Sequence, residues 1–262
     1  MEELVKLQVE DGIATVTLNR PEKYNALNQP LLHKLRKTFD ELAWDERVRV
    51  VVITGAGEAF CAGGDVVGHP DFSDDDVVRR YASVNHDRKW IQSLLRIPCP
   101  VITAINGWAV GAGADMVWAS DLRIASEKAT FVEAFTNLGL MPNLGGTYLL
   151  QRNIGMARAM ELILMGEPFT AKQAESWGLI NRAVPHDQLY DVVYSWARKL
   201  AAKSPHALAR AKESIWLGTE GSLNQALQRD CEGQNFLLGT PELREAVAKF
   251  VARRKEQEEK NG

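Results

Sequence analysis

The sequence predicts an α/β fold, in which strands and helices alternate through the first 200 residues and helices follow to the end. Short β-branched runs at 48–54 and 101–105 indicate strands buried on both faces. Glycines follow each run, and apolar residues between the runs recur at helical spacing. We therefore expect an α/β core at residues 1–200 and a separate helical region at residues 201–262, within the size range of large one-domain folds.

The chain is predicted to begin with a β-hairpin. Apolar and polar residues alternate on both sides of Asp11-Gly12, a dipeptide that tolerates the positive φ angles of a tight turn. The segment NRPEKYNALN at 19–28 then breaks the strand at Pro21. Leucines and Phe39 recur at helical spacing after it and predict a helix that ends near Trp44.

A unit of strand, glycine turn and helix is then predicted twice. The strand at 48–54 precedes FCAGGD at 60–65, which lies beyond the carboxyl end of that strand, where α/β sheets bind ligands. Residues 66–76 have the composition of a surface loop, and a helix is predicted at 77–96. The second unit has its strand at 101–105, its glycine turn at 107–113 and its helix at 112–119, with a third strand from 122.

The rest of the chain is predicted to be helical, because apolar residues keep helical spacing there. Three starts are well marked: Thr170 with Gln173 forms a capping box, and Ser204 and Thr240 each precede a proline at the first helical position. The expected helices are 147–152, 157–165, 171–177, 187–203, 205–218, 222–238 and 241–254.

Composition and motifs argue against several kinds of partner. The net charge of −3, with charges scattered, gives no footprint for nucleic acid, and no apolar run reaches the ~20 residues that span a bilayer. Three distant cysteines and the lack of a signal peptide predict a cytoplasmic protein. The five histidines match no metal-ligand spacing, so no metal is assigned. A GxGxxG match fails at Met116, and P-loop and GxSxG motifs are missing.

The motif NGWAVGAGAD at 106–115 predicts a site that polarises a carbonyl group. The N–H of Ala112, at the mouth of the expected helix, has no partner within that helix and lies at the positive end of its dipole. Ala62, in the turn of FCAGGD, is the candidate for a second donor, and each such donor supplies ~2.7–4 kcal/mol of transition-state stabilisation. Asp115 lies three residues after Ala112 on the same helical face, where partial burial would make it a general acid or base. The alternative is an aspartate that the helix dipole favours in any first turn.

Five segments together resemble the crotonase superfamily, which is the enoyl-CoA hydratase/isomerase family, and the resemblance covers nearly the whole chain. It implies a spiral of ββα units, C-terminal helices that assemble a homotrimer or homohexamer, and a CoA-thioester substrate without a further cofactor. The segments are NRPEKYNALN (19–28), FCAGGD (60–65), NGWAVGAGADMVWASDLRIA (106–125), LGLMPNLGGTYLL (138–150) and AESWGLINRAVP (174–185).

The resemblance also assigns roles by position. The oxyanion hole of the family corresponds to the N–H groups of Ala62 and Ala112. Lys23 matches a position near a CoA phosphate, although an ordinary solvated lysine is an equal alternative. The segments that hold CoA in the family correspond to Lys23, Asn25, Ala26, Leu27, Ala62, Gly63, Gly64 and Asp65.

The acid and base positions depart from the family pattern. Classical hydratases carry glutamates at the positions of Asp115 and Phe135, and single-acid isomerases carry an acid at the position of Asn143. Dienoyl-CoA isomerases share the aspartate but add acids at the other two positions. Asp115 is therefore the one family acid retained. Glu133 is a candidate substitute for the second acid, because it lies two residues before Phe135 and shares its side of an extended segment, and the alternative is an exposed glutamate.

The leading hypothesis is an enzyme that adds water to an enoyl-CoA thioester, or eliminates it, through a stabilised enolate. Asp115 would activate water or move a proton, and Asn143 would orient the water. The first alternative is an enoyl- or dienoyl-CoA double-bond isomerase, and an alternative of another class is a protein that binds acyl-CoA without turnover. The acyl group is expected to lie near residues 66–76, Trp90, Trp108 and the C-terminal helices.

Overall fold

The computed structural model describes residues 3–66 and 76–261. Most of the predicted surface loop at 66–76 therefore lies outside the described residues. The chain divides into two compact units, Met1–Leu200 and Ala201–Gly262. Each unit is considered by itself.

A six-stranded sheet forms the centre of the first unit, and it confirms the predicted hairpin and buried strands. β1 and β2 pair antiparallel, and every later neighbour pairs parallel. β3 and β5 are buried along their whole length, as their β-branched sequences predict. The order is β1 (Val5–Glu10), β2 (Ile13–Leu18), β3 (Val50–Gly55), β5 (Val101–Ile105), β7 (Leu122–Ser126) and β10 (Arg182–Val184).

A second, four-stranded sheet is made of strands of two or three residues, which are too short to show a period in the sequence. Its first three strands are parallel, and β9 pairs antiparallel with β8. β3, β5 and β7 of the larger sheet are each followed by one of these short strands, so the chain crosses to the smaller sheet three times before β10 returns to the larger one. The order is β4 (Ala59–Cys61), β6 (Trp108–Val110), β8 (Thr130–Val132) and β9 (Phe169–Thr170).

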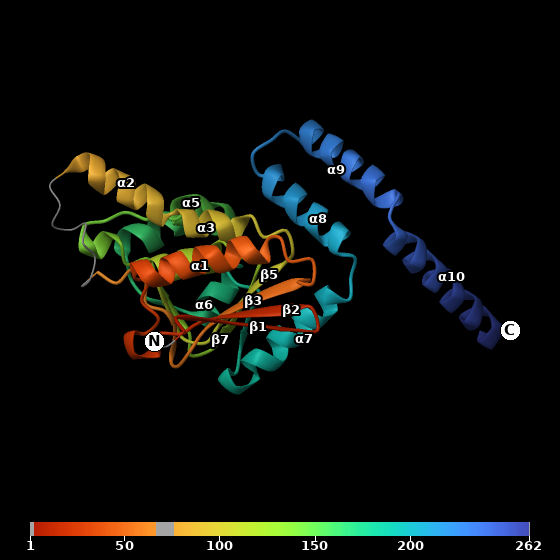
Figure 1. The fold of residues 1–262 in the computed structure, drawn as a ribbon, viewed down its shortest axis with the longest axis horizontal. Coiled ribbons are helices and arrows are strands. Elements are labelled where there is room, and N and C mark those ends of the chain that lie inside the picture. The colour runs from red at the N-terminus through yellow and green to blue at the C-terminus, as the bar shows by residue number, and fades with distance from the viewer. Residues whose placement is uncertain (1–2, 67–75, 262) are drawn as a thin grey trace. The chain divides into compact units, whose positions relative to one another are not determined.

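Helices cover the larger sheet. α1 and α3 pack against each other, and Figure 1 shows both lying over the strands of that sheet. The helix predicted at 77–96 is in fact two helices that meet at Arg88, and the helices predicted on either side of residue 155 are one, kinked at Gly155. The helices are α1 (Gln29–Leu42), α2 (Val77–Asp87), α3 (Lys89–Leu95), α4 (Ala112–Trp118), α5 (Gly146–Met165), α6 (Ala171–Ser176) and α7 (Leu189–Ala201).

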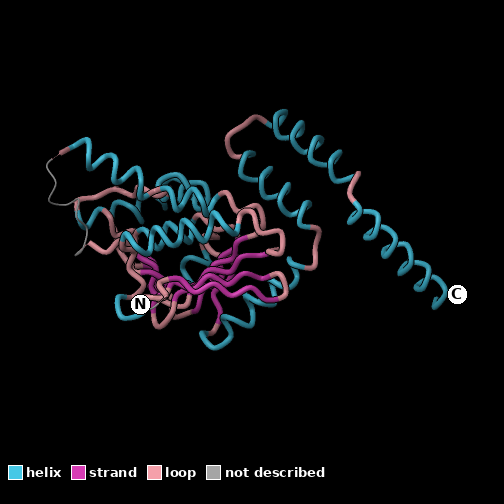
Figure 2. Tube along the Cα trace, in the orientation of Figure 1, coloured by secondary structure: helices cyan, strands magenta, loops and turns pink. Residues whose placement is uncertain are grey.

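The second unit consists of three helices and short connections, which Figure 2 shows as cyan coils joined by pink segments. α8 (Pro205–Gly218) packs against α9 (Leu223–Leu238), and α10 (Pro241–Asn261) follows. Large apolar side chains of these helices are exposed, among them Ile215, Phe236 and Phe250. Within the described residues, every helix is too short or too polar to span a bilayer.

Candidate active site

The two glycine-rich turns meet because β4 and β6 are parallel neighbours. Ala62 follows β4, and Ala112 begins α4 after β6, so both residues emerge at the same edge of the smaller sheet. A Cβ added to Gly63 would lie 3.7 Å from the backbone nitrogen of Ala112. Gly111 turns the chain into α4 with a φ of 49°, which a side chain would disfavour. The structure thus brings together the two residues predicted to polarise a carbonyl group.

Ala112 presents its N–H at the start of a helix that is buried throughout. As the first residue of α4 it has no hydrogen-bond acceptor inside the helix, and only 8% of its surface is exposed. A donor in this position is desolvated yet unpaired within its own helix. It can therefore stabilise negative charge on a ligand oxygen.

Ala62 differs from Ala112, because its N–H already has an acceptor. It donates to the carbonyl oxygen of Tyr24 at 2.9 Å. Tyr24 and Asn25 both have left-handed backbone conformations, with φ of 49° and 58°, which direct this carbonyl toward the turn. This contact holds Ala62 beside the site. In this structure, however, its N–H is hydrogen-bonded to Tyr24 and is not free for another acceptor. Sequence patterns carry no signal for the direction of a single carbonyl, so this contact was not predicted.

The segments predicted to hold CoA lie side by side. Leu27 donates to the carbonyl of Gly63 at 2.7 Å and accepts from the N–H of Asp65 at 3.0 Å. Asn25 is fully buried, and its side-chain amide donates to Ala59 at 2.8 Å. Ala26 is half-buried, and Gly64 is exposed.

Two charged residues of these segments, Lys23 and Asp65, have different surroundings. Lys23 is exposed at the end of the short 3-10 helix Pro21–Lys23, which agrees with both its predicted role and the solvated alternative. Asp65 pairs with the guanidinium of Arg20 at 3.2 Å. Arg20 also donates to the carbonyl of Ala26, so it ties the 20–27 loop to the turn after β4. This role of Arg20 was not predicted from the sequence.

Asp115 is buried in the core of the first unit. No part of its surface is exposed, and neither carboxylate oxygen has a partner at full hydrogen-bond geometry. Burial raises the pKa of this carboxyl to about 7, and the backbone N–H groups of Leu144 and Gly146 oppose the rise only in part. A first-turn aspartate favoured by the helix dipole alone would stay hydrated and acidic. Asp115 instead has the proton affinity of a general acid or base at neutral pH.

Glu133 is fully buried too, which contradicts the alternative of an exposed glutamate. Its Oε1 accepts the indole N–H of Trp118 at 2.7 Å, and its Oε2 is buried without a partner. Burial, and then the negative charge of Asp115, raises the pKa of Glu133 well above its usual value. The two carboxyl groups therefore lie close enough to interact.

The two positions where the family pattern is broken, Phe135 and Asn143, differ in burial. Phe135 is half-buried, and its ring lies 3.5 Å from where a Cβ of Gly111 would be. The ring therefore covers the turn that leads into α4. Asn143 is exposed, although Leu144 beside it is buried and contacts Asp115 through its backbone. Trp90 and Trp108 were both expected near the acyl group. Trp108 is 48% exposed, whereas Trp90 is a core residue with 2% of its surface exposed.

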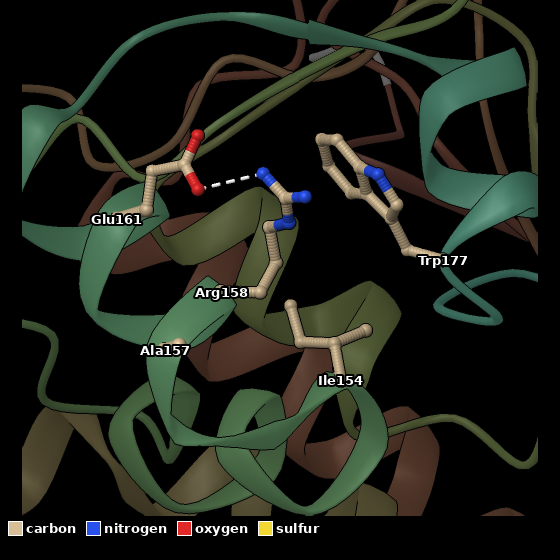
Figure 3. A pocket seen from close by; sticks show the side chains of 5 residues that line it. All are labelled: Ile154, Ala157, Arg158, Glu161 and Trp177. Atoms are coloured by element: carbon tan, nitrogen blue, oxygen red, sulfur yellow. Dashed lines mark hydrogen bonds and ion pairs between the residues drawn. The ribbon is translucent and has the colours of Figure 1, made fainter.

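A separate pocket of about 360 Å³ lies between α5 and Trp177, the residue after α6, and Figure 3 shows its lining. Arg158 lies between Glu161, with which it pairs at 2.6 Å, and the ring of Trp177, 4.5 Å away. The charge of Arg158 is thus satisfied within the pocket. No cluster of three or more metal-ligating side chains occurs among residues 3–66 and 76–261.

Comparison with known proteins gives one consistent family. A model of the enoyl-CoA hydratase/isomerase family matches residues 8–261. The chain is 36% identical to the 1,2-epoxyphenylacetyl-CoA isomerase of Escherichia coli, over 98% of both proteins, and 35% identical to a probable enoyl-CoA hydratase of Rhodobacter capsulatus, over 95% of both. The crystal structure of an enoyl-CoA hydratase from Bacillus anthracis superposes with a TM-score of 0.90 at 32% identity, covering 96% of this chain and 97% of that one.

Proposed function

This chain belongs to the enoyl-CoA hydratase/isomerase family, and from that premise we propose that it is an enzyme that adds water to an enoyl-CoA thioester. The observation that carries the proposal is Asp115. It is a buried carboxyl with a pKa of about 7, three residues after the helix-terminal N–H of Ala112. That arrangement places a proton-transfer group and a carbonyl-polarising group on one short helix.

In the proposed reaction the ionised Asp115 takes a proton from water as the water oxygen bonds to Cβ of the substrate. The electron pair of the Cα=Cβ bond moves into the thioester, which becomes an enolate. Asp115 then returns the proton to Cα, so the enzyme ends unchanged and the product is a 3-hydroxyacyl thioester. A group that must both accept and donate a proton works best when its pKa is near the operating pH, as that of Asp115 is.

The N–H of Ala112 stabilises the enolate oxygen in this proposal. Ala62 is the second donor, and it becomes available when the substrate carbonyl replaces the carbonyl of Tyr24, its acceptor in this structure. Asn143 is exposed at the end of the segment that contacts Asp115, where its amide can orient the attacking water. The loop of residues 23–27, tied to residues 62–65, holds the CoA moiety.

Double-bond isomerisation is the second candidate, and one observation favours it. A relative from Streptococcus mutans, 32% identical over 94% of both proteins, is named a trans-2-decenoyl-(acyl-carrier-protein) isomerase. A single carboxyl with a pKa of about 7 can also move a proton between two carbons of one substrate. Hydration remains the first proposal. One short side chain can position a water molecule more easily than it can reach two separate carbon atoms of the substrate.

We also propose that the active form is a cytoplasmic homotrimer or homohexamer. Exposed apolar side chains on the C-terminal helices support self-association, since helices that expose such residues normally bury them against a partner. No disulfide joins Cys61, Cys99 or Cys231, which suits a reducing compartment. Sedimentation of the purified full chain tests the assembly.

The reaction is tested by offering the enzyme a panel of enoyl-CoA esters of different chain lengths in deuterated water. Hydration predicts loss of the enoyl-thioester absorbance and a 3-hydroxyacyl product with one deuterium at Cα. Isomerisation predicts migration of the double bond, with solvent deuterium entering the substrate but no net addition of water. Tight binding of CoA esters with no change in any of them would contradict the proposal and favour the binding-protein alternative.

A further inference from the structure

Asp115 and Glu133 form a buried pair of acids that the proposed reaction uses only in part. Both side chains are 0% exposed. One of the four carboxyl oxygens, Oε1 of Glu133, has a hydrogen-bond partner, and the other three are buried without one. Taking an ionised carboxylate out of water without compensation is so costly that such a group takes up a proton instead.

No positive charge compensates the pair. Among the described residues, neither carboxyl belongs to an ion pair, and residues 144–149, which lead into and begin α5, are uncharged. Arg123 of β7 is the buried cation near α4, but its guanidinium donates to the carbonyls of Val117 and Trp118 at 3.0 and 2.8 Å. It neutralises the carboxyl end of α4 rather than either acid.

We propose that Glu133 holds a proton at neutral pH and is a positioning residue for Asp115, so that the pair carries a single negative charge. The inference rests on the proposed role of Asp115. Oε1 accepts the indole N–H of Trp118 and Oε2 is buried without a partner, so the proton held by Glu133 is placed on Oε2. Trp118 is three residues after Asp115 on α4, and the same helix therefore places the working acid and the anchor of its neighbour.

The order of ionisation follows from the surroundings. Burial raises the pKa of both groups; the N–H groups of Leu144 and Gly146 lower that of Asp115 in part, whereas the negative charge of Asp115 adds to the rise for Glu133. The pair thus loses one proton near pH 7 and the second at clearly higher pH. Loss of the second proton puts a second negative charge beside the enolate and Asp115. Activity is then expected to fall on the alkaline side.

The decisive variant is Glu133→Gln, which keeps an oxygen acceptor for Trp118 but cannot ionise. In wild type, kcat/KM falls at high pH by about tenfold per pH unit, as for loss of one essential proton. In Glu133→Gln that alkaline limb is absent, while the acidic limb of Asp115 stays near pH 7. A glutamate that only anchors Trp118 would leave both limbs as they are, and identical limbs in the two proteins would overturn the proposal.

An infrared titration tests the proton directly and needs no turnover. One pH unit above the Asp115 pKa of about 7, wild type should keep the absorption of one buried protonated carboxyl, and Glu133→Gln should lose it. In Asp115→Asn the same absorption should disappear at lower pH than in wild type, since the charge that holds the proton is gone. The last comparison leaves Glu133 unaltered, so it stands even when Glu133→Gln does not fold. No such absorption in wild type would overturn the proposal, whereas its presence without enoyl-CoA turnover would overturn only the proposed function.

Discussion

Gly146 lies directly against the carboxylate of Asp115: a Cβ added to this glycine would overlap Oδ1. Gly146 is the first residue of α5, so the amino end of a long helix closes over the acid on α4. An aspartate is one methylene shorter than the glutamate that hydratases of this family carry. The close approach of α5 fits this shorter side chain and leaves no room for a larger residue at 146.

Gly146→Ala is therefore expected to displace Asp115. Alanine normally stabilises a helix relative to glycine, but here overpacking should cost about 1–3 kcal/mol of unfolding free energy. A shift of the carboxylate by ~1 Å should lower kcat about a hundredfold. Urea unfolding and steady-state kinetics measure both effects. Gly233→Ala, inside α9 where an added Cβ meets only Arg210 at 4.0 Å, is the control and should not lose stability.

The stability of the protein should depend on pH through Asp115. Its pKa is near 3.9 when unfolded and about 7 when folded, so between these values the native state binds more protons than the unfolded state. Stability then falls as pH rises through this window, by up to about 1.4 kcal/mol per pH unit for one proton. In Asp115→Asn this part of the slope should vanish, as urea unfolding at several pH values would show. An equal slope in both proteins would mean that Asp115 ionises normally.

Ala112→Pro removes the backbone donor without breaking the helix, because proline is accepted at the first position of a helix. Loss of one oxyanion donor should lower kcat by about 10²–10³ while circular dichroism and binding of a CoA ester stay unchanged. Ala112→Gly keeps the N–H and is the matched control, expected to stay within a few-fold of wild type. Full activity in the proline variant would exclude this donor.

Arg20→Ala should weaken substrate binding rather than chemistry. The side chain joins the 20–27 loop to Asp65 and does not contact Asp115 or Ala112. We expect KM to rise roughly tenfold, which is about 1.4 kcal/mol, with kcat unchanged. Arg47→Ala removes an exposed pair with Asp45 and should alter neither constant. A fall in kcat with constant KM would place Arg20 in the chemistry instead.

Much of the fold follows from local sequence signals. The hairpin at Asp11-Gly12, the buried strands β3 and β5 and the capping box at Thr170 all form as expected, because each depends on residues close in sequence. The smaller sheet was not foreseen. Strands of three residues, such as β4 and β6, are too short for alternation to show, and their pairing is decided by contacts distant in sequence.

The site residues divide in the same way: some follow from local sequence, and others depend on contacts between distant elements. The positions of Ala112 and Asp115 depend on one turn and one helix, and both were predicted to lie at the site. The surroundings of Glu133 depend on Trp118 and Asp115, which a different element, α4, brings to it. Its spacing before Phe135 was the one available signal, and that signal could not separate a buried acid from an exposed one. Gly146 and the carbonyl of Tyr24 act through close approach of backbone, for which residue type alone gives no measure.

The proton-transfer role of Asp115 is tested most directly by kcat/KM of Asp115→Asn on the enoyl-CoA ester that wild type hydrates best. Removal of a general acid and base predicts a loss of about 10²–10⁴-fold, with the dissociation constant of a CoA ester unchanged. Asp121→Asn is the matched control, since Asp121 accepts the N–H of Val101 at 2.8 Å and should affect stability alone. Equal kcat/KM in wild type and Asp115→Asn would contradict the account.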